Sequence, residues 1–479
     1  MKVTNCLVPV VLGKVIQKEG YFALPEELGV AYGSFPSWVT EAFSARTGIR
    51  VVQKPQPDGK LSLEKDEVLA EEGYRLCVDP DGIQVAAKTE RGIIWALTTL
   101  VVLMEDRKVP CGEIEDAPRF SYRGQSFDVV RHFFPVEEVK KVIEGLSLAK
   151  INVLHWHLTD DQGWRIEIGK YPNLTADDDS YTQDEIRAVI AFAKVRGVEI
   201  IPEIDMPGHM SAALHAYPEL GCDGKPVRRP TGGGIFKTIL CAGKDFTYRF
   251  LEDVLDEVTA LFPSEYFHIG GDEAPKMAWE ACPDCKARLA LLKLNDFEEL
   301  QTDFNRRVTA MLAARGKKVI CWNDVLKGGA DPEHMQIQYW IPTDAEKIKA
   351  FAEAGGSWVY SDAFERYFDY PYAINSMRKA YLSEPSWMGD TAAVTCPPKG
   401  VEGCMWTERI WENERLEKFF FPRVQATAEN AWSGPGSYTE FKERLQAYLM
   451  KLQSGACGKM ASGIQFTAPE GWDPTGAAA

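Results

Sequence analysis

The sequence lacks any apolar run long enough to cross a membrane, and its basic residues are fewer than its acidic ones. The longest apolar stretches, such as "WALTTLVVLM" at residues 95–104, reach half of the about 20 residues that a spanning helix needs. Lysine and arginine together number 54, against 70 aspartate and glutamate residues, so the formal charge is −16. Since a negative surface repels phosphate groups and anionic lipids, neither nucleic acid nor a membrane is an expected partner.

Short internal repeats and low-complexity tracts are also absent. At 479 residues the chain is too long for one small core, and 45% apolar with 26% charged residues is ordinary for a globular protein. Alternating strands and a helix ahead of "EIEDAPRF" predict a smaller α/β accessory domain over residues 1–117. We expect a catalytic domain over residues 118–455 and a glycine- and alanine-rich C-terminal tail over residues 456–479.

From about residue 118 onward, short apolar runs alternate with longer amphipathic ones, which is typical of a parallel sheet with crossover helices. The stretch "TQDEIRAVIAFAKVRG" carries helix end signals, because Thr182 and Glu185 form a capping box and Gly197 follows as a stop. Eight such strand and helix units predict an α/β fold of the (β/α)8 TIM barrel type. The expected strands are "GQSFDVV" at 124, "NVLHWHL" at 152, "VEIIPEI" at 198, "YFHIGG" at 266, "KVICWND" at 318, "MQIQYW" at 335, "SWVYSD" at 357 and "VEGCMWTE" at 401.

Cysteine occurs in an odd number, eleven, so at least one thiol stays outside any intramolecular disulfide. Cys282 and Cys285 form a lone CxxC, and a zinc site needs a second ligand pair that the spacing does not reveal. We therefore expect a structural loop or a local disulfide there, and no metal. Cys222 and Cys241 bracket a loop rich in glycine and basic residues, which predicts a mobile rim. A disulfide between these two is an alternative that would imply export.

The N-terminal stretch "MKVTNCLVPVVLGKVIQ" has a lysine and a short apolar run, but no small-residue cleavage site follows it. We interpret it as mature protein. Two locations stay open: periplasmic or secreted if a leader has been removed, and cytoplasmic as the sequence stands.

Two adjacent carboxylates end the fourth expected strand, in "HIGGDE" at residues 268–273. In such a barrel the carboxyl ends of the strands converge on one face, where the site is expected. Ordinary glycosidases hold two carboxyl groups about 5–9 Å apart on opposite sides of the scissile bond, which sequence neighbours cannot do. If Glu273 is the general acid, the nucleophile comes from elsewhere, and a 2-acetamido group of the substrate is the known exception. Asp272 would then orient the acetamido N–H and balance the positive charge that develops there.

Other strand ends carry acidic side chains, tryptophans and an arginine, which favours a sugar pocket over a phosphate pocket. The strand-end residues are Asp128, Arg131 and His132 after the first strand, "HWHLTDDQGWR" after the second, "EIDMPGH" after the third, and Trp322, Trp340, Trp406 and Glu408 after later ones.

The segments "YRGQSFDVVRHFF", "NVLHWHLTDDQGWR", "EIDMPGH", "HIGGDE" and "MWTE" resemble, in order and spacing, glycoside hydrolase family 20, the β-N-acetylhexosaminidases. The likeness covers nearly the whole chain, and its accessory-domain part rests on "GYRLCVDPDGIQ" and "GIIWALTTL". The resemblance implies a retaining exo-acting enzyme that removes terminal N-acetylglucosamine or N-acetylgalactosamine from glycans through an oxazolinium intermediate. It implies no redox or nucleotide cofactor.

The same resemblance implies roles for individual residues. Asp272 is the polarising carboxylate, Glu273 the acid and later the base for water, and Tyr367 the donor to the acetamido oxygen. Asp205 and His209 resemble a relay that tunes the protonation of the acid. "CWND" differs from the usual tryptophan, acid, acid ending, so Asn323 has no assigned role. The implied substrate-binding positions are Arg123, Asp160, His209, Trp322, Trp340, Asp369, Trp406 and Glu408, and the implied supporting positions are Asp205 and His155.

Three other functions stay open at this point. One is a noncatalytic glycan-binding protein that keeps the pocket without turnover. Another is a metal-dependent hydrolase built on His155 and His157, which share one strand face, with Asp160 or His209. The third is a disaccharide-releasing enzyme of the lacto-N-biosidase type. Arg123 could also be a structural salt bridge instead of a sugar ligand.

Overall fold

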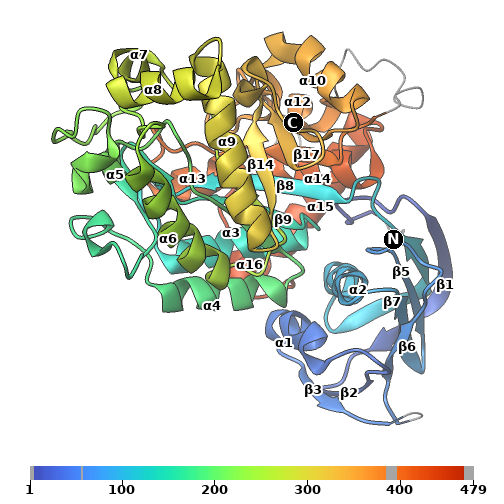
Figure 1. The fold of residues 1–479 in the computed structure, drawn as a ribbon. Coiled ribbons are helices and arrows are strands. Elements are labelled where there is room, and N and C mark those ends of the chain that lie inside the picture. Colours follow the sequence, from blue (N-terminus) through green and yellow to red (C-terminus); the bar gives the residue numbers. More distant parts are fainter. Residues whose placement is uncertain (1–4, 56–57, 385–395, 469–479) are drawn as a thin grey trace.

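The protein consists of a small α/β domain followed by a closed barrel. The computed structural model describes residues 5–55, 58–384 and 396–468. In Figure 1 the first domain, in blue, lies beside the barrel, and helix α2 lies on the face of its sheet that is turned to the barrel. The seven strands of that sheet run in the order β1-β7-β5-β6-β4-β2-β3. Its elements are β1 (Lys14–Ala23), β2 (Glu27–Ala31), η1 (Ser37–Thr40), α1 (Glu41–Thr47), β3 (Arg50–Gln53), β4 (Leu61–Lys65), β5 (Tyr74–Asp79), β6 (Gly82–Ala87), α2 (Glu90–Leu103) and β7 (Lys108–Asp116).

Eight parallel strands then close a barrel, which confirms the predicted (β/α)8 fold. Their order around the barrel is β12-β13-β14-β15-β16-β17-β8-β9. Each begins within two residues of the start of an expected strand, because the short apolar runs between amphipathic helices mark buried parallel strands. The expected ends of β13 and β17 run three and five residues too far, since they include the polar turn residues that follow the strands. The strands are β8 (Tyr122–Asp128), β9 (Val153–His157), β12 (Glu199–Glu203), β13 (Tyr266–His268), β14 (Lys318–Trp322), β15 (Met335–Tyr339), β16 (Ser357–Tyr360) and β17 (Gly400–Gly403), with a small hairpin of β10 (Thr159–Asp160) and β11 (Gly163–Trp164) after β9.

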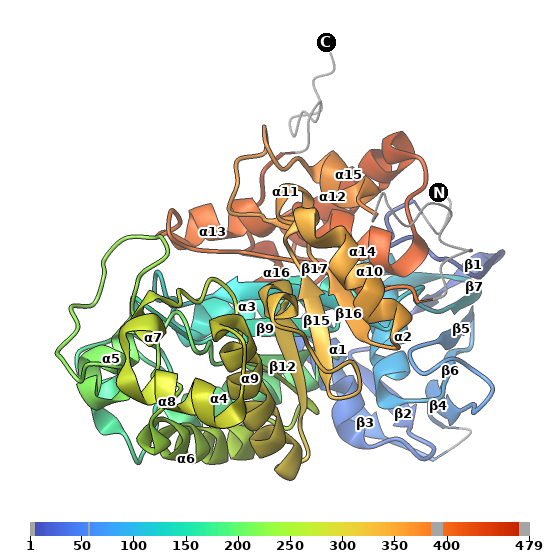
Figure 2. The ribbon, with the colours of Figure 1, turned by 45° about the horizontal axis from the view of Figure 1, so that its top comes forward.

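Helices surround this barrel, as Figure 2 shows. The helix ends follow local sequence: in α4 the predicted capping box forms between Thr182 and Glu185, and Gly197 follows with a φ of 75°. The barrel helices are α3 (Val136–Leu148), α4 (Gln183–Lys194), α5 (Ser211–Ala216), α6 (Asp245–Leu261), α7 (Met277–Ala281), α8 (Pro283–Leu292), α9 (Phe297–Ala314), α10 (Ala345–Glu353), α11 (Ala363–Arg366), α12 (Met377–Leu382), α13 (Asn413–Phe420), α14 (Arg423–Ser433), α15 (Tyr438–Gln453) and α16 (Lys459–Ser462). Short 3-10 turns are η2 (Pro172–Leu174), η3 (Pro218–Leu220), η4 (Asn323–Lys327) and η5 (Pro342–Asp344).

The stretch after residue 456 starts as packed structure, although its composition predicts a surface tail. Cys457, Ala461 and Ile464 are buried, and α16 contacts α3. The glycine- and alanine-rich pattern hides these few apolar anchors. Residues 469–479 of the expected tail lie outside the described residues.

Strand register places polar side chains of four neighbouring strands at one level of the barrel. Asp128 pairs with His157, His157 with Glu203, and Glu203 with His268. This level lies at the carboxyl ends of the strands, where loops of a barrel build a site. Among the described residues, no helix is both long and apolar enough to cross a membrane.

Candidate active site

Asp272 and Glu273 follow β13 on a tight turn that depends on two glycines. Gly270 and Gly271 have φ values of 65° and 94°, a region where side chains are strained. A Cβ atom on Gly270 would lie 1.8 Å from Asp205 Oδ1, so only glycine fits there. Glu273 itself has a φ of 45°, which is uncommon for a residue other than glycine. Backbone strain of this kind is concentrated at functional sites, and here it lies in the carboxylate pair.

His209 lies behind both carboxylates. Its Nε2 atom is 3.5 Å from Asp272 Oδ2 and 3.5 Å from Glu273 Oε2, while its Nδ1 atom is 3.1 Å from Asp160 Oδ1. Burial disfavours the charged ring, but Asp160 and Asp205 outweigh burial and raise the pKa of His209 well above its usual value. An imidazolium at this place connects the carboxylate pair to a deeper carboxylate.

Asp160 is that deeper carboxylate, and its position corrects the expectation that it binds sugar hydroxyls. The side chain is buried, and Arg131 Nη2 and His157 Nε2 each lie 2.7 Å from its Oδ2 atom. Burial alone would raise its pKa, but Arg131 and His209 hold the pKa of Asp160 well below the usual range. Asp160 is thus the acidic partner of His209 in the relay, a place that the sequence interpretation gave to Asp205.

Asp205 supports the turn instead. Its Oδ1 atom accepts a hydrogen bond from the backbone N–H of Gly271 at 3.3 Å. Burial and the neighbouring charge of Asp272 raise the pKa of Asp205 well above its usual value. A neutral Asp205 at this place adds no negative charge beneath the catalytic pair.

Arg123, expected to bind substrate, lies far from these residues and the expectation is wrong. It is the second residue of β8, at the end of the barrel that faces the small domain, and is fully buried. Its Nη2 atom donates to Glu72 Oε2 at 2.5 Å, and its guanidinium lies over the ring of Trp432 at 4.9 Å. Arg123 is therefore the structural salt bridge that was the alternative interpretation.

Arg131 is the arginine of the site, although the sequence interpretation noted it only as a strand-end residue. Besides Asp160, its guanidinium pairs with Asp128 at 3.3 Å, lies 3.9 Å from Glu408 and stacks over the ring of Trp406 at 4.9 Å. Its position three residues after the end of β8, on the functional face, was the signal that could have identified it.

Aromatic side chains form the walls of the pocket. The ring of Trp406 lies 5.8 Å from Trp322 and 6.0 Å from Tyr367, and Tyr367 stacks on Trp340 with ring centroids 6.1 Å apart. Trp322 is almost completely buried, so it forms the floor, whereas Trp340 and Trp406 are partly exposed. The structure thus brings together the three tryptophans and Tyr367, which follow four different strands. Flat apolar rings of this kind suit an N-acetyl group and the face of a sugar.

Asn323 acquires a role from its contacts. Its Oδ1 atom accepts hydrogen bonds from the backbone N–H groups of Trp340 and Ile341, at 2.8 and 3.1 Å. Next to it, Asp324 Oδ2 accepts a hydrogen bond from Trp340 Nε1 at 2.9 Å. Together the two residues fix the orientation of the Trp340 ring.

Asp369 and Glu408 lie together on another side of the pocket. Burial and the charge of Glu408 raise the pKa of Asp369 to about 7. Asp369 Oδ1 has no hydrogen-bond partner within the described part of the chain, although it is buried. An unpaired buried acceptor of this kind is suited to a ligand hydroxyl.

A second layer of histidines lies below the pocket and was only partly foreseen through His155. Glu203 is its centre: it accepts from Trp322 Nε1 at 2.9 Å, and His155 Nε2 and His268 Nδ1 each lie 3.0 Å away. Burial opposes charge on His155, but Glu203 and Glu402 outweigh it and raise its pKa to about 9. This layer holds the floor tryptophan in place.

Several carboxylate and imidazole groups of the site are close enough to bind a metal ion, as the metal-dependent alternative requires. They are His155 with Glu203 and His268, His157 with Glu203 and Asp205, Asp160 with Asp205 and His209, and His209 with Asp272 and Glu273. Atoms of these groups already form hydrogen bonds with one another. For example, His157 bonds through one ring nitrogen to Glu203 and through the other to Asp160.

Four cysteines also converge outside the pocket: Cys222, Cys241, Cys282 and Cys285. This corrects the expectation that Cys282 and Cys285 have no second cysteine pair near them.

The arrangement can hold an apolar-faced, hydroxyl-rich ligand and exchange a proton with it. Asp272 and Glu273 stand at the pocket with Asp272 Oδ1 unpaired in the described structure. Burial raises the pKa of Asp272 to about 6 although His209 opposes the shift. One carboxylate can therefore bind a polar group while its neighbour acts as acid or base.

Comparisons with known proteins agree with this geometry. The family described as glycosyl hydrolase family 20, catalytic domain, matches residues 120–435, and domain 2 of the same family matches residues 8–117. A β-hexosaminidase of Porphyromonas gingivalis is 34% identical over 85% of this chain, and the alignment spans only 57% of that relative. A β-hexosaminidase of Akkermansia muciniphila is 31% identical, with 80% of this chain and 84% of that protein covered.

Solved structures show the same likeness over almost the full chain. A β-N-acetylhexosaminidase of Bacteroides fragilis superposes with a TM-score of 0.86 at 32% identity, covering 96% of both chains. An exo-β-N-acetylglucosaminidase of Vibrio harveyi, solved with N-acetylglucosamine, gives a TM-score of 0.84 at 30% identity and covers 98% of this chain and 79% of that one.

Proposed function

Because the chain belongs to glycosyl hydrolase family 20, we propose that it is a retaining exo-β-N-acetylhexosaminidase. Its substrates are glycans that end in a β-linked N-acetylglucosamine or N-acetylgalactosamine. The substrate itself supplies the nucleophile, through the carbonyl oxygen of its 2-acetamido group. The observation that carries the proposal is the pairing of Asp272 and Glu273 as sequence neighbours that share one imidazole, His209.

In the first step the acetamido oxygen forms a bond to the anomeric carbon while the glycosidic C–O bond breaks. Glu273 gives its proton to the departing oxygen, and the sugar remains as a bicyclic oxazolinium ion. Asp272 accepts the acetamido N–H and balances the positive charge that develops on it. Tyr367 donates to the acetamido oxygen from the opposite wall.

In the second step water attacks the anomeric carbon and Glu273 takes one of its protons. The oxazolinium ring opens, and two inversions give net retention. His209 serves both steps, because an imidazolium 3.5 Å from Glu273 can compensate the negative charge that Glu273 acquires on losing its proton. Asp160, held ionised by Arg131, keeps His209 charged.

Exo action is supported by the loop between Cys222 and Cys241, which packs against Glu408. A Cβ atom on Gly233 would lie 2.7 Å from Cγ of Glu408, so the loop backbone lies against the aliphatic part of this side chain. Gln162 Nε2 also donates to the carbonyl of Gly232 at 2.9 Å. A pocket walled at Glu408 accommodates one terminal sugar ring, with its hydroxyls on Glu408 and Asp369.

The test compares an aryl N-acetyl-β-glucosaminide with the plain aryl β-glucoside. The wild type should release the phenol from the first only, and Glu273→Gln should lower kcat by roughly 10²–10⁴-fold with the acid–base group removed. Glu280→Gln is a matched control, because Glu280 is exposed on α7. Equal activity on both glycosides would contradict substrate assistance, and a disaccharide product from a tetrasaccharide would contradict release of single sugars. Binding of N-acetylglucosamine without any hydrolysis would favour the glycan-binding alternative.

A further inference from the structure

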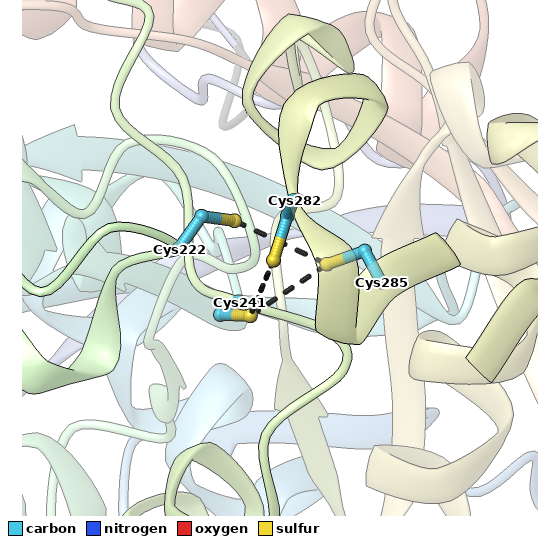
Figure 3. A group of neighbouring side chains, drawn as sticks. All are labelled: Cys222, Cys241, Cys282 and Cys285. Carbon is cyan, nitrogen blue, oxygen red and sulfur yellow. Dashed lines mark hydrogen bonds between the residues drawn. The ribbon is translucent and has the colours of Figure 1, made fainter. Parts of the chain in front are cut away.

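Four cysteines from three separate segments meet beside the active-site loops. Their Sγ atoms all lie within 4.8 Å of one another. Figure 3 shows the four sulfur atoms pointing toward a common centre. Cys241, Cys282 and Cys285 are buried and Cys222 is partly buried. All eleven cysteines belong to the described residues, and each is a free thiol.

Specific backbone contacts bring these segments together. A β-bridge between Gly221 and Leu240 places Cys222 beside Cys241. Cys282 and Cys285 lie at the start of α8, and a Cβ atom on Gly243 would be 2.3 Å from the carbonyl carbon of Asp284. Only glycine at position 243 allows the two segments of the chain to approach so closely. The convergence is therefore built by the fold and is not a chance contact of side chains.

The buried indole of Trp279 strengthens this junction. It donates from Nε1 to the carbonyl of Leu240 at 2.8 Å, while the Trp279 carbonyl accepts from the N–H of Cys282. These two hydrogen bonds join the segment that carries Cys241 to the start of α8.

The spacing of the sulfur atoms matches a tetrahedral metal site. Cys241 Sγ lies 3.7 Å from Cys282 and 3.6 Å from Cys285, and Cys222 Sγ lies 4.0 Å from Cys285. In a tetrahedron with Zn–S bonds of about 2.3 Å, neighbouring sulfurs are about 3.8 Å apart. A pair of disulfides would instead bring sulfurs together in twos, at about 2.05 Å. Here Cys241 and Cys285 each contact two other thiols, at 3.6 to 4.0 Å.

We propose that Cys222, Cys241, Cys282 and Cys285 bind one Zn²⁺ ion as four thiolates. Each thiol loses its proton on binding, and no redox partner is needed. The site is structural, because four protein ligands fill a tetrahedral zinc ion and leave no position for a substrate.

The position of the site tells what the ion stabilises. Cys222 and Cys241 flank the rim loop, residues 223–240, whose Gly233 packs against the side chain of Glu408. Cys282 and Cys285 follow the Asp272–Glu273 turn by about ten residues of chain. One ion thus ties the rim of the sugar pocket to the segment that follows the catalytic pair.

Metal content tests the proposal directly. The full chain, purified without chelator, should hold one zinc per molecule by elemental mass spectrometry, and a thiol-blocking mercurial should release it. Unfolding in chelator without reductant should expose all eleven thiols, whereas two disulfides would leave four fewer. Protein that carries no zinc, and that in reduced form takes up no equivalent of Zn²⁺ against a competing chelator, overturns the proposal. So does a disulfide count of two at this cluster, or iron in place of zinc.

Cysteine variants separate this site from adventitious binding. The double variant Cys282→Ser with Cys285→Ser should lose the zinc, while Cys77→Ser, in β5 of the small domain, should keep it. If the double variant does not fold, Co²⁺ added to reduced wild-type protein gives the second readout, because tetrahedral thiolate coordination produces intense visible bands. Equal zinc in both variants, or Co²⁺ bands that do not saturate at one equivalent, would contradict the assignment.

Trypsin reports on the rim loop, which contains Arg228 and Lys237. Release of zinc should speed cleavage at these residues by roughly tenfold or more, because local opening of a loop controls its proteolysis. Unchanged cleavage would show that the ion does not hold the rim, and that part of the proposal would fall.

Discussion

The two ends of the barrel both contain buried arginine and carboxylate groups, but the hydrogen bonding of these groups differs. The closed end faces the small domain, and the open end carries Asp272 and Glu273. At the end that faces the small domain, Arg123 donates to Glu72, to the carbonyl of Lys150 and to the carbonyl of Phe120. At the other end, buried polar atoms such as Arg131 Nε, Asp272 Oδ1 and Asp369 Oδ1 have no partner within the described chain. Complete pairing makes a rigid domain junction, whereas incomplete pairing leaves hydrogen-bonding capacity for a ligand.

Left-handed residues occur at both ends. His209 and Glu273 lie at the open end, where the turn after β13 is held by Gly270 and Gly271. At the closed end Lys150, whose carbonyl accepts from Arg123, has a φ of 57°. Backbone strain therefore does not distinguish the two ends, and the difference between them lies in the hydrogen bonding of their buried polar groups.

Removing the arginine of the closed end should cause the largest loss of stability. Arg123→Ala leaves the buried Glu72 with only the partly exposed Arg91, 3.6 Å away, as a cationic partner. Breaking a buried pair costs about 3–5 kcal/mol. Urea unfolding would measure the loss, while kcat/KM of the folded protein should stay within a factor of about two, since the active site is not touched.

Arg75→Ala is the matched control for this experiment. Arg75 pairs with Glu115 on the exposed face of the small domain, and its side chain is 49% exposed. Exposed pairs contribute about 0–1 kcal/mol, so this variant should unfold almost like the wild type. Loss of activity without loss of stability in Arg123→Ala would instead place Arg123 in the site.

The two arginines also show how far the sequence predicts this protein. Arg123 is the second residue of β8 and Arg131 lies three residues beyond its end, and periodicity located that strand to within two residues. The eight strands and the Asp272–Glu273 pair were predictable because they depend on local pattern. Which arginine enters the pocket depends on its position relative to β8. The sequence interpretation chose Arg123, near the start of the strand, but Arg131, beyond its carboxyl end, is the one that lies in the site.

Other misses have the same origin in contacts between distant segments. Asp160 and Asp205 both follow strand ends, but only the folded chain shows that Asp160 lies against His209 and Arg131. Sequence spacing could not show that Cys222 and Cys241 lie beside the CxxC pair. The β-bridge at Gly221 and the close contact of Gly243 with Asp284 bring the four cysteines together, and both depend on the folded chain. Local sequence sets the elements, and long-range packing sets the partners.

At the open end, Asp272→Asn should abolish most activity without weakening the fold. The amide can still touch the acetamido group, but it cannot balance the developing positive charge, and loss of one such electrostatic contact lowers kcat by about 10²–10³-fold. Steady-state kinetics on the aryl N-acetyl-β-glucosaminide would measure it. Asp81→Asn, on an exposed turn of the small domain, serves as the control and should have no effect. Near-normal kcat in Asp272→Asn would remove Asp272 from the mechanism.

The same substitution should change how stability depends on pH. Burial raises the pKa of Asp272 to about 6 in the folded protein, above the value of about 3.9 in an unfolded chain. The folded state therefore binds the proton more tightly, and wild-type stability relative to Asp272→Asn falls as pH rises from about 4 to about 6. A shift of this size corresponds to at most about 3 kcal/mol.

Urea unfolding of both proteins at pH 5 and pH 8 would measure this difference. Asp272→Asn should gain stability over the wild type at the higher pH. If the wild type instead gains stability relative to Asp272→Asn from pH 5 to pH 8, Asp272 is stabilised as an anion. The carboxylates of the open end would then be hydrogen-bonded as completely as those of the closed end.

His209→Gln should give the smallest of these effects, because it alters the group behind the carboxylates and not the carboxylates themselves. Glutamine can still donate to Asp160 or to Glu273, but it carries no charge, so Glu273 loses the cation 3.5 Å away. Residues in such supporting positions change activity by about 10–100-fold. The loss should appear in kcat more than in KM, since His209 acts through Glu273 and does not itself hold the sugar. His334→Gln, on an exposed turn before β15 at the opposite end of the barrel, should leave both unchanged. If His209→Gln raises KM and leaves kcat unchanged, the imidazole only positions the substrate-binding side chains, and its charge does not support Glu273.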